Sequence, residues 1–245
     1  MSDAPTKRGI LLAIEGIDGA GKTTQVNHLA ALLRSVGEDV VQSKEPTDGK
    51  WGTQIRQSAA IERLPLEREL ELFVKDRQEH VAKLILPSLE QGKIVILDRY
   101  FYSTIAYQGS RGASTEEVEN AMSFAPVPDM VFFLDAPPEV TLYRISNGRN
   151  EQPNAFEQQE SLAQCADVFR NLAQTHEEIY RIDATKSEDA VQQEICDLLC
   201  KHALQHKRCA KSTGCDVDYC SFRLAGDCPW WELKGRIAQA VQAES

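Results

Sequence analysis

The chain has 245 residues, of which 42% are hydrophobic and 26% are charged, and its formal net charge is −10. This length suits one α/β domain with room for a small appendage, and the acidic balance argues against an extended nucleic-acid-binding surface. No apolar run reaches the roughly 18 residues that a membrane helix needs. The N-terminal residues also lack the apolar core of a secretory signal. We therefore expect no nucleic-acid or membrane partner and a location in the cytoplasm.

The first half of the chain alternates between strand and helix patterns. Residues 9–16 form an apolar run typical of a buried strand, and residues 22–37 have the apolar spacing of an amphipathic helix that ends at a glycine. Residues 39–46 predict a second strand. Residues 67–92 predict a helix that Pro87 bends or divides.

The same alternation continues to about residue 206. Residues 93–100 and 129–138 predict two more strands, and residues 138–146 and 158–179 predict helices on either side of a polar segment. Residues 180–185 predict a fifth strand, and residues 187–205 a helix capped by Ser187. This order predicts an α/β fold, a three-layer doubly wound parallel sheet of about five strands, formed by residues 1–206.

Residues 207–245 are predicted to form a separate, cysteine-rich C-terminal extension. Six of the seven cysteines lie after residue 190, and four of them are Cys209, Cys215, Cys220 and Cys228. Four thiolates can bind Zn²⁺ or an iron–sulfur cluster, although the paired C-x-x-C spacing of zinc ribbons is absent. Disulfides and unligated cysteines remain alternatives. The clustering favours a local device in a reducing compartment.

A glycine-rich loop follows the first predicted strand. Gly16, Gly21, Lys22 and Thr23 fit the pattern G-x-x-x-x-G-K-[ST], and Gly19 and Thr24 belong to the same loop. Glycines let successive backbone N–H groups turn toward an anion, and the following helix adds its positive end. The lysine can reach the β- and γ-phosphates, and the threonine hydroxyl can bind Mg²⁺. The loop is therefore predicted to bind the phosphates of ATP or a similar nucleotide.

A second charged feature ends the strand at residues 93–100, where Asp98 is followed directly by Arg99. At the carboxyl end of a parallel strand, Asp98 can hold Mg²⁺ through water while Arg99 presents a planar cation to the same crevice. The N-K-x-D segment of a GTPase is absent. The pattern therefore favours phosphoryl transfer to a second substrate.

Six segments in this order resemble the thymidylate kinase family, whose members phosphorylate dTMP with ATP. They are EGIDGAGKTT, KEP, LFVKDR, DRYFYSTIAYQG, LDAPPEV and IDAT, and the resemblance runs from about residue 9 to residue 204. It implies a P-loop kinase fold, ATP with Mg²⁺ as the phosphate donor, dTMP as the acceptor, and a homodimer.

The resemblance also implies roles for matching residues of the acceptor site. Asp18 would lie near the sugar 3′-hydroxyl, Phe73 would stack on the thymine ring, and Arg77 would contact the base and the acceptor phosphate. Arg99 would clamp that phosphate. Further matching positions are Thr104 at the base, Tyr107 against the sugar 2′-carbon, and Gln108 nearby.

In this family an arginine of the phosphate loop or of a mobile lid reaches the transferring phosphoryl group. The loop here carries Gly19 and Ala20 and no arginine, so the lid, at about residues 144–156, must supply it. Arg149 is the predicted reaching residue, and Arg144 is predicted to close on ATP. Lys22, Arg99, Arg149 and Asp18 are the predicted catalytic residues.

Two departures from the family concern the acceptor. Lys44 stands where an arginine is usual, and a lysine cannot fork onto a phosphate. The lid is poor in arginine. The sequence thus predicts a dTMP kinase, with two alternatives: a kinase for another deoxynucleotide or small acceptor, and a regulatory ATP-binding module whose cysteine tail senses metal or redox state.

Overall fold

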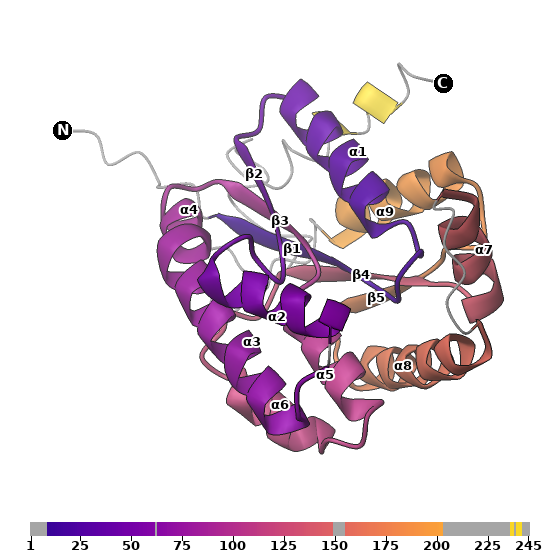
Figure 1. Ribbon diagram of the computed structural model, residues 1–245. Coiled ribbons are helices and arrows are strands. Elements are labelled where there is room, and N and C mark those ends of the chain that lie inside the picture. The colour runs from indigo at the N-terminus through magenta and orange to yellow at the C-terminus, as the bar shows by residue number, and fades with distance from the viewer. Residues whose placement is uncertain (1–8, 62, 149–154, 203–235, 238, 242–245) are drawn as a thin grey trace.

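The computed structural model describes residues 9–61, 63–148, 155–202, 236–237 and 239–241. In this part of the chain, five parallel strands form one sheet in the order β2-β3-β1-β4-β5. The strands are β1 Ile10–Glu15, β2 Val40–Lys44, β3 Ile94–Asp98, β4 Met130–Asp135 and β5 Ile179–Asp183. Helices cover both faces of the sheet (Figure 1). The predicted three-layer, doubly wound fold is confirmed.

The helices follow the predicted order with three additions. The bounds are α1 Lys22–Ser35, α2 Lys50–Ile61, α3 Leu66–His80, α4 Leu86–Glu90, α5 Phe101–Gly109, α6 Thr115–Ala121, α7 Pro138–Gly148, α8 Ala155–Thr175 and α9 Glu188–His202. Helices α2, α5 and α6 were not predicted. None of the helices among these residues is long and apolar enough to cross a lipid bilayer.

Two predicted helix boundaries needed correction or refinement. The predicted helix 67–92 is divided before Pro87 by a π-helical turn, Val81–Ile85, because proline has no N–H to continue the regular hydrogen bonding. The predicted helix 158–179 ends earlier, at Thr175, because Ile179 instead pairs with Val131 at the start of β5.

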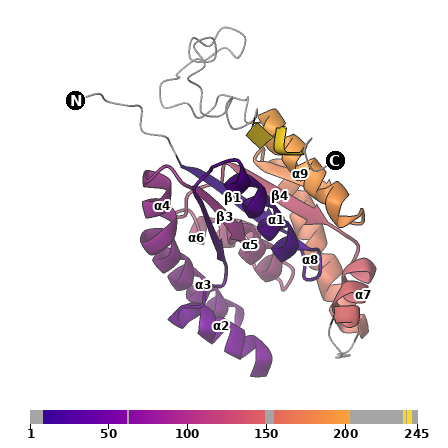
Figure 2. The same ribbon diagram turned by 90° about the horizontal axis from the view of Figure 1, so that it is seen from above.

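The core lies on both faces of the sheet because successive side chains of a strand point to opposite faces. On β1, Leu12 and Ile14 pack with residues of α1 and α9, whereas Leu11 and Ala13 pack with residues of α5 and α8. Figure 2 shows these two helical layers with the sheet between them. All four side chains are at most 1% exposed.

The parallel arrangement brings the carboxyl ends of the strands to one edge of the sheet. Strand β1 lies between β3 and β4, and Ile14 of β1 is opposite Asp98 of β3. The chain passes from one side of β1 to the other at this point, which is where ligands bind in open α/β sheets. The phosphate loop leaves β1 at this edge.

The last described residues pack on the core rather than apart from it. Arg236 donates hydrogen bonds to the Val36 carbonyl and to Glu38, just after α1. Ile237 is 1% exposed and belongs to the core cluster that includes Leu33 and Leu199. The domain boundary between residues 206 and 207 stays a prediction. The end of the predicted extension nevertheless contributes to the core of the preceding domain.

This packing predicts that Ile237→Ala destabilises the whole domain. A buried isoleucine truncated to alanine typically costs about 2–5 kcal/mol of unfolding free energy. Urea unfolding would measure the loss, with Ile61→Ala as the matched control because Ile61 is 88% exposed. Equal stability of the two variants would mean that the C-terminal segment does not form part of the core.

Candidate active site

The phosphate loop has a backbone that only glycines can adopt. Gly16 has φ +143°, and a Cβ there would lie 2.6 Å from the Leu134 carbonyl oxygen. Gly19 has φ +81°, and a Cβ there would lie 2.5 Å from the Thr141 carbonyl oxygen. The loop therefore packs directly on β4 and α7. Gly21 precedes α1 without a side-chain cap, so the first N–H groups of α1 are free to bind an anion.

Lys22 lies at the centre of the loop. Its side chain is buried, and its ammonium group donates a 2.8 Å hydrogen bond to the Ile17 carbonyl oxygen. Burial, reinforced by the nearby Arg99 guanidinium, lowers the pKa of Lys22 to about 7. A bound triphosphate would supply the negative charge that favours the protonated lysine.

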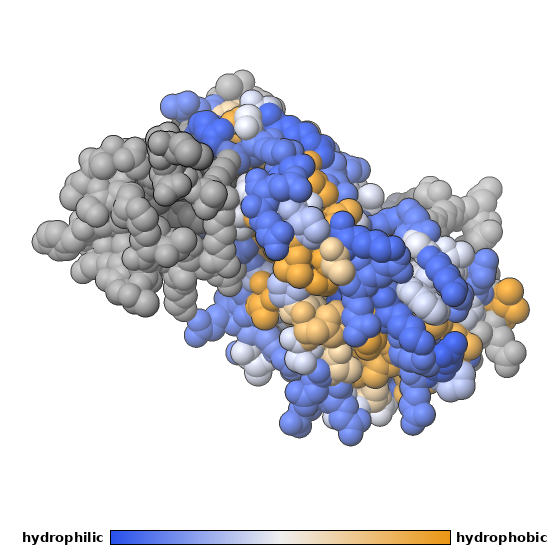
Figure 3. Space-filling model, turned by 90° about the vertical axis from the view of Figure 1, so that its left-hand side faces the viewer, coloured by the Kyte–Doolittle hydropathy of each residue, from blue (hydrophilic) through white to orange (hydrophobic). Residues whose placement is uncertain are grey.

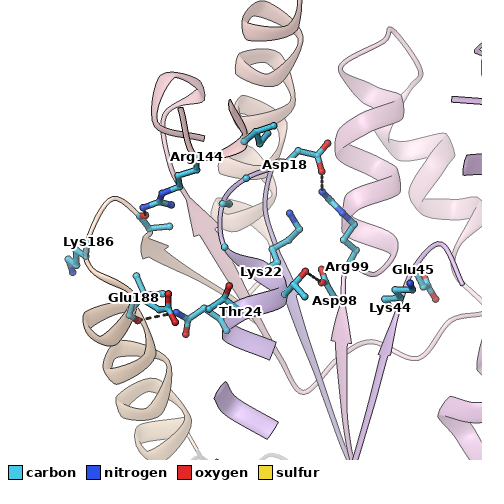
Figure 4. A pocket seen from close by; sticks show the side chains of 18 of the residues that line it. Asp18, Lys22, Thr24, Lys44, Glu45, Asp98, Arg99, Arg144, Lys186 and Glu188 are labelled. Atoms are coloured by element: carbon cyan, nitrogen blue, oxygen red, sulfur yellow. Dashed lines mark hydrogen bonds and ion pairs between the residues drawn. The ribbon is translucent and has the colours of Figure 1, made fainter. Parts of the chain in front are cut away.

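The loop borders a cavity of about 970 Å³, whose walls include Gly19, Gly21, Lys22, Thr23, Thr24 and Arg144. Figure 4 shows Lys22 between Asp98 and Arg99 on one side and Arg144 and Lys186 on the other. Arg144 donates a 2.9 Å hydrogen bond to the Ala184 carbonyl oxygen after β5. All the predicted ATP-binding residues except Gly16 therefore border one cavity, and Gly16 lies at the start of the loop, where its carbonyl oxygen accepts a hydrogen bond from Arg99.

Thr23 and Asp98, the two residues predicted to bind Mg²⁺, contact each other. The Thr23 hydroxyl donates to Asp98 Oδ2 across 2.5 Å, at the junction of α1 and β3. A hydroxyl and a carboxylate are hard oxygen donors of the kind that Mg²⁺ prefers, and Mg²⁺ usually takes only one or two protein ligands beside phosphates and water. The pair therefore fits the predicted magnesium site.

Arg99 is held at the mouth of the loop by several groups. Its Nη1 donates to the Gly16 carbonyl oxygen at 3.0 Å, and its Nη2 donates to Asp18 Oδ1 at 2.6 Å. Burial would raise the pKa of Asp18, but the Arg99 and Lys22 charges outweigh it and hold that pKa below its ordinary value. Asp18 is therefore an anion beside the cation that is predicted to clamp the acceptor phosphate.

A second cavity, of about 230 Å³, adjoins the first. The residues predicted for the acceptor site all border it, namely Asp18, Phe73, Arg77, Arg99, Thr104, Tyr107 and Gln108. Asp18 and Arg99 border both cavities. Residues from β3, α3 and α5 that are far apart in the sequence therefore meet at one place.

Arg77 differs from its expected environment. It is 1% exposed, and its Nε and Nη2 donate to Glu45 Oε2 at 2.8 and 2.5 Å. Its Nη2 also donates to Thr104 Oγ1 at 3.1 Å, and its Nη1 to the sulfur of Met122 at 2.7 Å. Four of its five N–H groups are thus used inside the protein, which leaves little of the guanidinium for an acceptor phosphate. A contact with the base through the remaining N–H is compatible with this geometry.

Comparisons with known proteins agree with this arrangement. A family model described as thymidylate kinase matches residues 14–195. The chain is 50% identical to a thymidylate kinase of Xanthomonas campestris pv. campestris (strain B100) over 186 residues, which cover 76% of this chain and 81% of the relative. It is 47% identical to a thymidylate kinase of Xylella fastidiosa (strain M12) over 191 residues, covering 78% and 87% of the two chains.

The fold is also similar to a solved structure. The crystal structure of thymidylate kinase from Ehrlichia chaffeensis matches with a TM-score of 0.63 and 30% identity, over 78% of this chain and 99% of that chain. The chain belongs to the thymidylate kinase family. The family match ends inside α9, so the cysteine-rich residues lie beyond it.

Some of the residues predicted from the family lie outside the described part of the chain. Arg149, the predicted reaching arginine, is one of them, and so are Cys209, Cys215, Cys220 and Cys228. Within the residues that are described, no group of three or more histidine, cysteine, aspartate or glutamate side chains could hold a metal ion.

Arg56 is a cavity residue that the sequence did not reveal. It lies on the unpredicted helix α2 and borders both cavities. Its Nη1 donates to the Pro46 carbonyl oxygen at 2.8 Å, and its Nη2 lies 3.1 Å from Asp48 Oδ1. The Nζ atom of Lys44 lies 3.2 Å from the same Asp48 oxygen. Arg56 therefore brings a forked cation to the region where the sequence shows only a lysine.

Glu15 is the other residue that was missed. It ends β1 and is 0% exposed. Burial raises the pKa of Glu15 to about 7, although hydrogen bonds from Ser103 and the charge of Arg99 act in the opposite direction. A carboxyl group in the sheet beneath the loop has no signature in an apolar sequence run.

This burial predicts how Glu15→Gln changes stability with pH. Above pH 7 the Glu15 carboxyl group is ionised in both the folded and the unfolded protein. The folded protein then bears the full cost of the buried charge. Between the ordinary pKa of 4.5 and the native value of about 7, the unfolded state has already lost its proton, so wild-type stability falls as the pH rises. The full difference corresponds to about 3 kcal/mol, since one pKa unit is about 1.4 kcal/mol.

Glutamine carries no such charge, so the unfolding free energy of Glu15→Gln relative to wild type should increase from pH 4.5 to pH 8. Urea unfolding at both pH values would measure this. Glu116→Gln, at an exposed position of α6, is the control and should show no comparable trend. A relative stability that stays constant with pH would contradict the raised pKa.

Proposed function

We propose that this chain transfers the γ-phosphoryl group of ATP to dTMP and releases ADP and dTDP. The observation that carries this proposal is the pair of adjoining cavities, one bordered by a phosphate loop and the other by the acceptor residues expected in the family. Asp18, Arg99 and Arg56 border both cavities, so they lie where two nucleotides would present their phosphates to each other.

The donor side holds ATP through backbone and side-chain donors. The N–H groups of the loop and of the first turn of α1 bind the phosphates, and Lys22 neutralises charge between the β- and γ-phosphates. Thr23 and Asp98 would hold Mg²⁺, which supplies further neutralisation of the phosphate charge when bound. Arg144 closes on the nucleotide from α7.

The acceptor side holds dTMP so that its phosphate faces the donor. Arg99 and Arg56 fix that phosphate, and Asp18 lies close to the sugar 3′-hydroxyl. The attacking phosphate oxygen is already an anion, so no protein base is required. Positioning and charge neutralisation account for most of the catalysis in phosphoryl transfer.

Gln108 supports thymine as the base. Its Nε2 donates to Glu69 Oε2 at 2.6 Å, which turns its Oε1 away from that partner. Within the described structure this oxygen is buried and has no hydrogen-bond partner, although the residue borders the acceptor cavity. Thymine presents an N–H donor at N3, which this oxygen can accept, whereas cytosine presents an acceptor there. In this proposal Phe73 stacks on the thymine ring, and Tyr107 lies against the sugar 2′-carbon.

Coupled measurement of ADP release with each of the four deoxynucleoside monophosphates tests the function. We expect dTMP to be used best, with dCMP weaker by about 10²-fold or more because a buried polar group would be left unpaired. Preference for another acceptor would favour the alternative of a different small-molecule kinase. No turnover with any of them would favour a regulatory ATP-binding module.

Arg149 remains our proposal for the arginine that reaches the transferring phosphoryl group.

A homodimer is the proposed assembly. Figure 3 shows apolar side chains gathered on the side of the molecule that carries α3 and α4. On α4, Leu86 is 42% exposed. Light scattering of the purified protein would test the dimer. The cytoplasm remains the proposed location of the protein.

The four cysteines at 209, 215, 220 and 228 remain a proposed site for Zn²⁺ or an iron–sulfur cluster. The proposal rests on the presence of four thiols within 20 residues of sequence. Metal analysis and visible absorbance of the purified full chain would decide between zinc, a cluster and no metal.

A further inference from the structure

Glu15 lies directly behind the phosphate loop and joins two elements of the site. Its Oε1 accepts hydrogen bonds from the backbone N–H groups of Tyr100, at 2.7 Å, and Ser103, at 3.1 Å. Its Oε2 accepts the Ser103 hydroxyl. These groups belong to the N-cap and the first turn of α5, whose N-terminus attracts a carboxylate. The Glu15 side chain borders neither cavity of the site, so it cannot act on a substrate directly.

Arg99 lies immediately before this turn in an uncommon backbone conformation. Its φ is +69°, a region that non-glycine residues seldom adopt and that costs free energy. Its backbone N–H donates to the Ile14 carbonyl oxygen at 3.0 Å, next to Glu15. Such a conformation persists only where the surrounding structure holds it. Here the Arg99 N–H binds the Ile14 carbonyl oxygen, and the N–H of the next residue, Tyr100, binds Glu15.

Ser103 links the two charged side chains. Arg99 Nη1 donates to Ser103 Oγ at 2.9 Å, and the Ser103 hydroxyl is itself directed at Glu15. A serine has one O–H to donate and two lone pairs that accept. Because its proton points to Glu15, its lone pairs are left for Arg99. The direction of both hydrogen bonds is thus set by the buried carboxylate.

We propose that Glu15 is a positioning residue that acts through Ser103 to orient the Arg99 guanidinium toward the acceptor phosphate. The other terminal nitrogen, Nη2, donates to Asp18 Oδ1 at 2.6 Å and to the Tyr107 hydroxyl at 3.4 Å, beside the second cavity, which both residues border. The consequence for catalysis rests on the proposed function, because it assumes that the clamped group is a phosphate of the acceptor nucleotide.

The test uses Ser103→Ala, Glu15→Gln and the double variant of the full chain. Ser103→Ala removes the link but leaves both backbone bonds to Glu15. Glu15→Gln presents an amide N–H to Ser103 Oγ, so the serine no longer donates to residue 15 and one of the two lone pairs that were left for Arg99 is taken. We expect each single variant to lower kcat for dTMP by about 10-fold or more while the KM for ATP stays within about twofold, since only the clamp is misdirected.

The double variant distinguishes a linked chain from two separate effects. If Glu15 acts through Ser103, the double variant should lose about as much kcat as the worse single variant, within about threefold. Losses that multiply would overturn the proposal. Ser35→Ala is the control, because the Ser35 hydroxyl donates to the Leu32 carbonyl oxygen at the end of α1 and Ser35 borders neither cavity of the site. It should keep the wild-type kcat.

A second readout does not depend on the reaction. Heteronuclear NMR of the Arg99 guanidinium should show hindered rotation in the wild type and faster rotation in Ser103→Ala. If wild type phosphorylates none of the four nucleotides, the proposed function fails, and the NMR comparison still decides the positioning role. Unchanged Arg99 signals in Ser103→Ala would overturn that role, even if Glu15→Gln did not fold.

Discussion

Replacing Lys22 by methionine is expected to lower kcat for dTMP phosphorylation by about 10²–10³, the cost of removing one preorganised donor from a transition state that accumulates charge. The lysine side chain is buried at the centre of the loop, and the residue borders the cavity proposed for ATP. Methionine has a similar length but no charge. The KM for ATP should also rise, because the same ammonium group binds the phosphates in the ground state.

Folding should not be impaired by this change. Methionine removes a cation that is costly to bury, so the thermal midpoint of Lys22→Met should equal or exceed that of wild type. Lys83→Met is the control, since Lys83 is 74% exposed and pairs only with Glu79 of the preceding helix in the structure described. A kcat for Lys22→Met within tenfold of wild type would contradict the assignment of the loop.

The parts of the fold and site that could be predicted are those whose signals lie in one short, continuous stretch of sequence. The phosphate loop combines a short apolar strand, glycines and an amphipathic helix within residues 10–35, and each signal is local. Asp98 and Arg99 were placed at the carboxyl end of a strand for the same reason. Because all strands are parallel, these local predictions were enough to bring Thr23 and Asp98 together.

Helices α2 and α5 could not be predicted because their local preferences point elsewhere. Helix α5 contains aromatic and β-branched residues that favour strands, and it is helical because Ile105 and Ala106 pack in the core against α8. Helix α2 contains Gly52, where a Cβ would lie 2.0 Å from the Thr47 carbonyl oxygen. Missing α2 also meant missing Arg56.

Glu15 was missed for a different reason. Its partners Tyr100 and Ser103 lie 85 and 88 residues later in the chain, so nothing near Glu15 in sequence reveals that they meet. The buried charges of this site lower stability while they fix the geometry of groups that must contact phosphate. A sequence shows which charges are present but not which of them the fold encloses.

The second large effect is expected for Arg77→Met, which should lower the unfolding free energy by about 3–5 kcal/mol, because removing one partner of a buried pair leaves the other charge uncompensated. The side chains of Arg77 and Glu45 are 1% and 3% exposed. Burial would raise the pKa of Glu45, but Arg77 and His80 outweigh it and keep the pKa below its ordinary value. Urea unfolding would measure the loss.

Combining Arg77→Met with Glu45→Gln separates stability from recognition. The double variant removes both charges of the Arg77–Glu45 pair, so most of the lost unfolding free energy should return. Its kcat/KM for dTMP should stay low, because Arg77 borders the acceptor cavity and methionine cannot donate to the base. If the double variant regained activity together with stability, Arg77 would serve only to neutralise Glu45. If Arg77→Met alone were as stable as wild type, Glu45 would not depend on Arg77 for compensation of its buried charge.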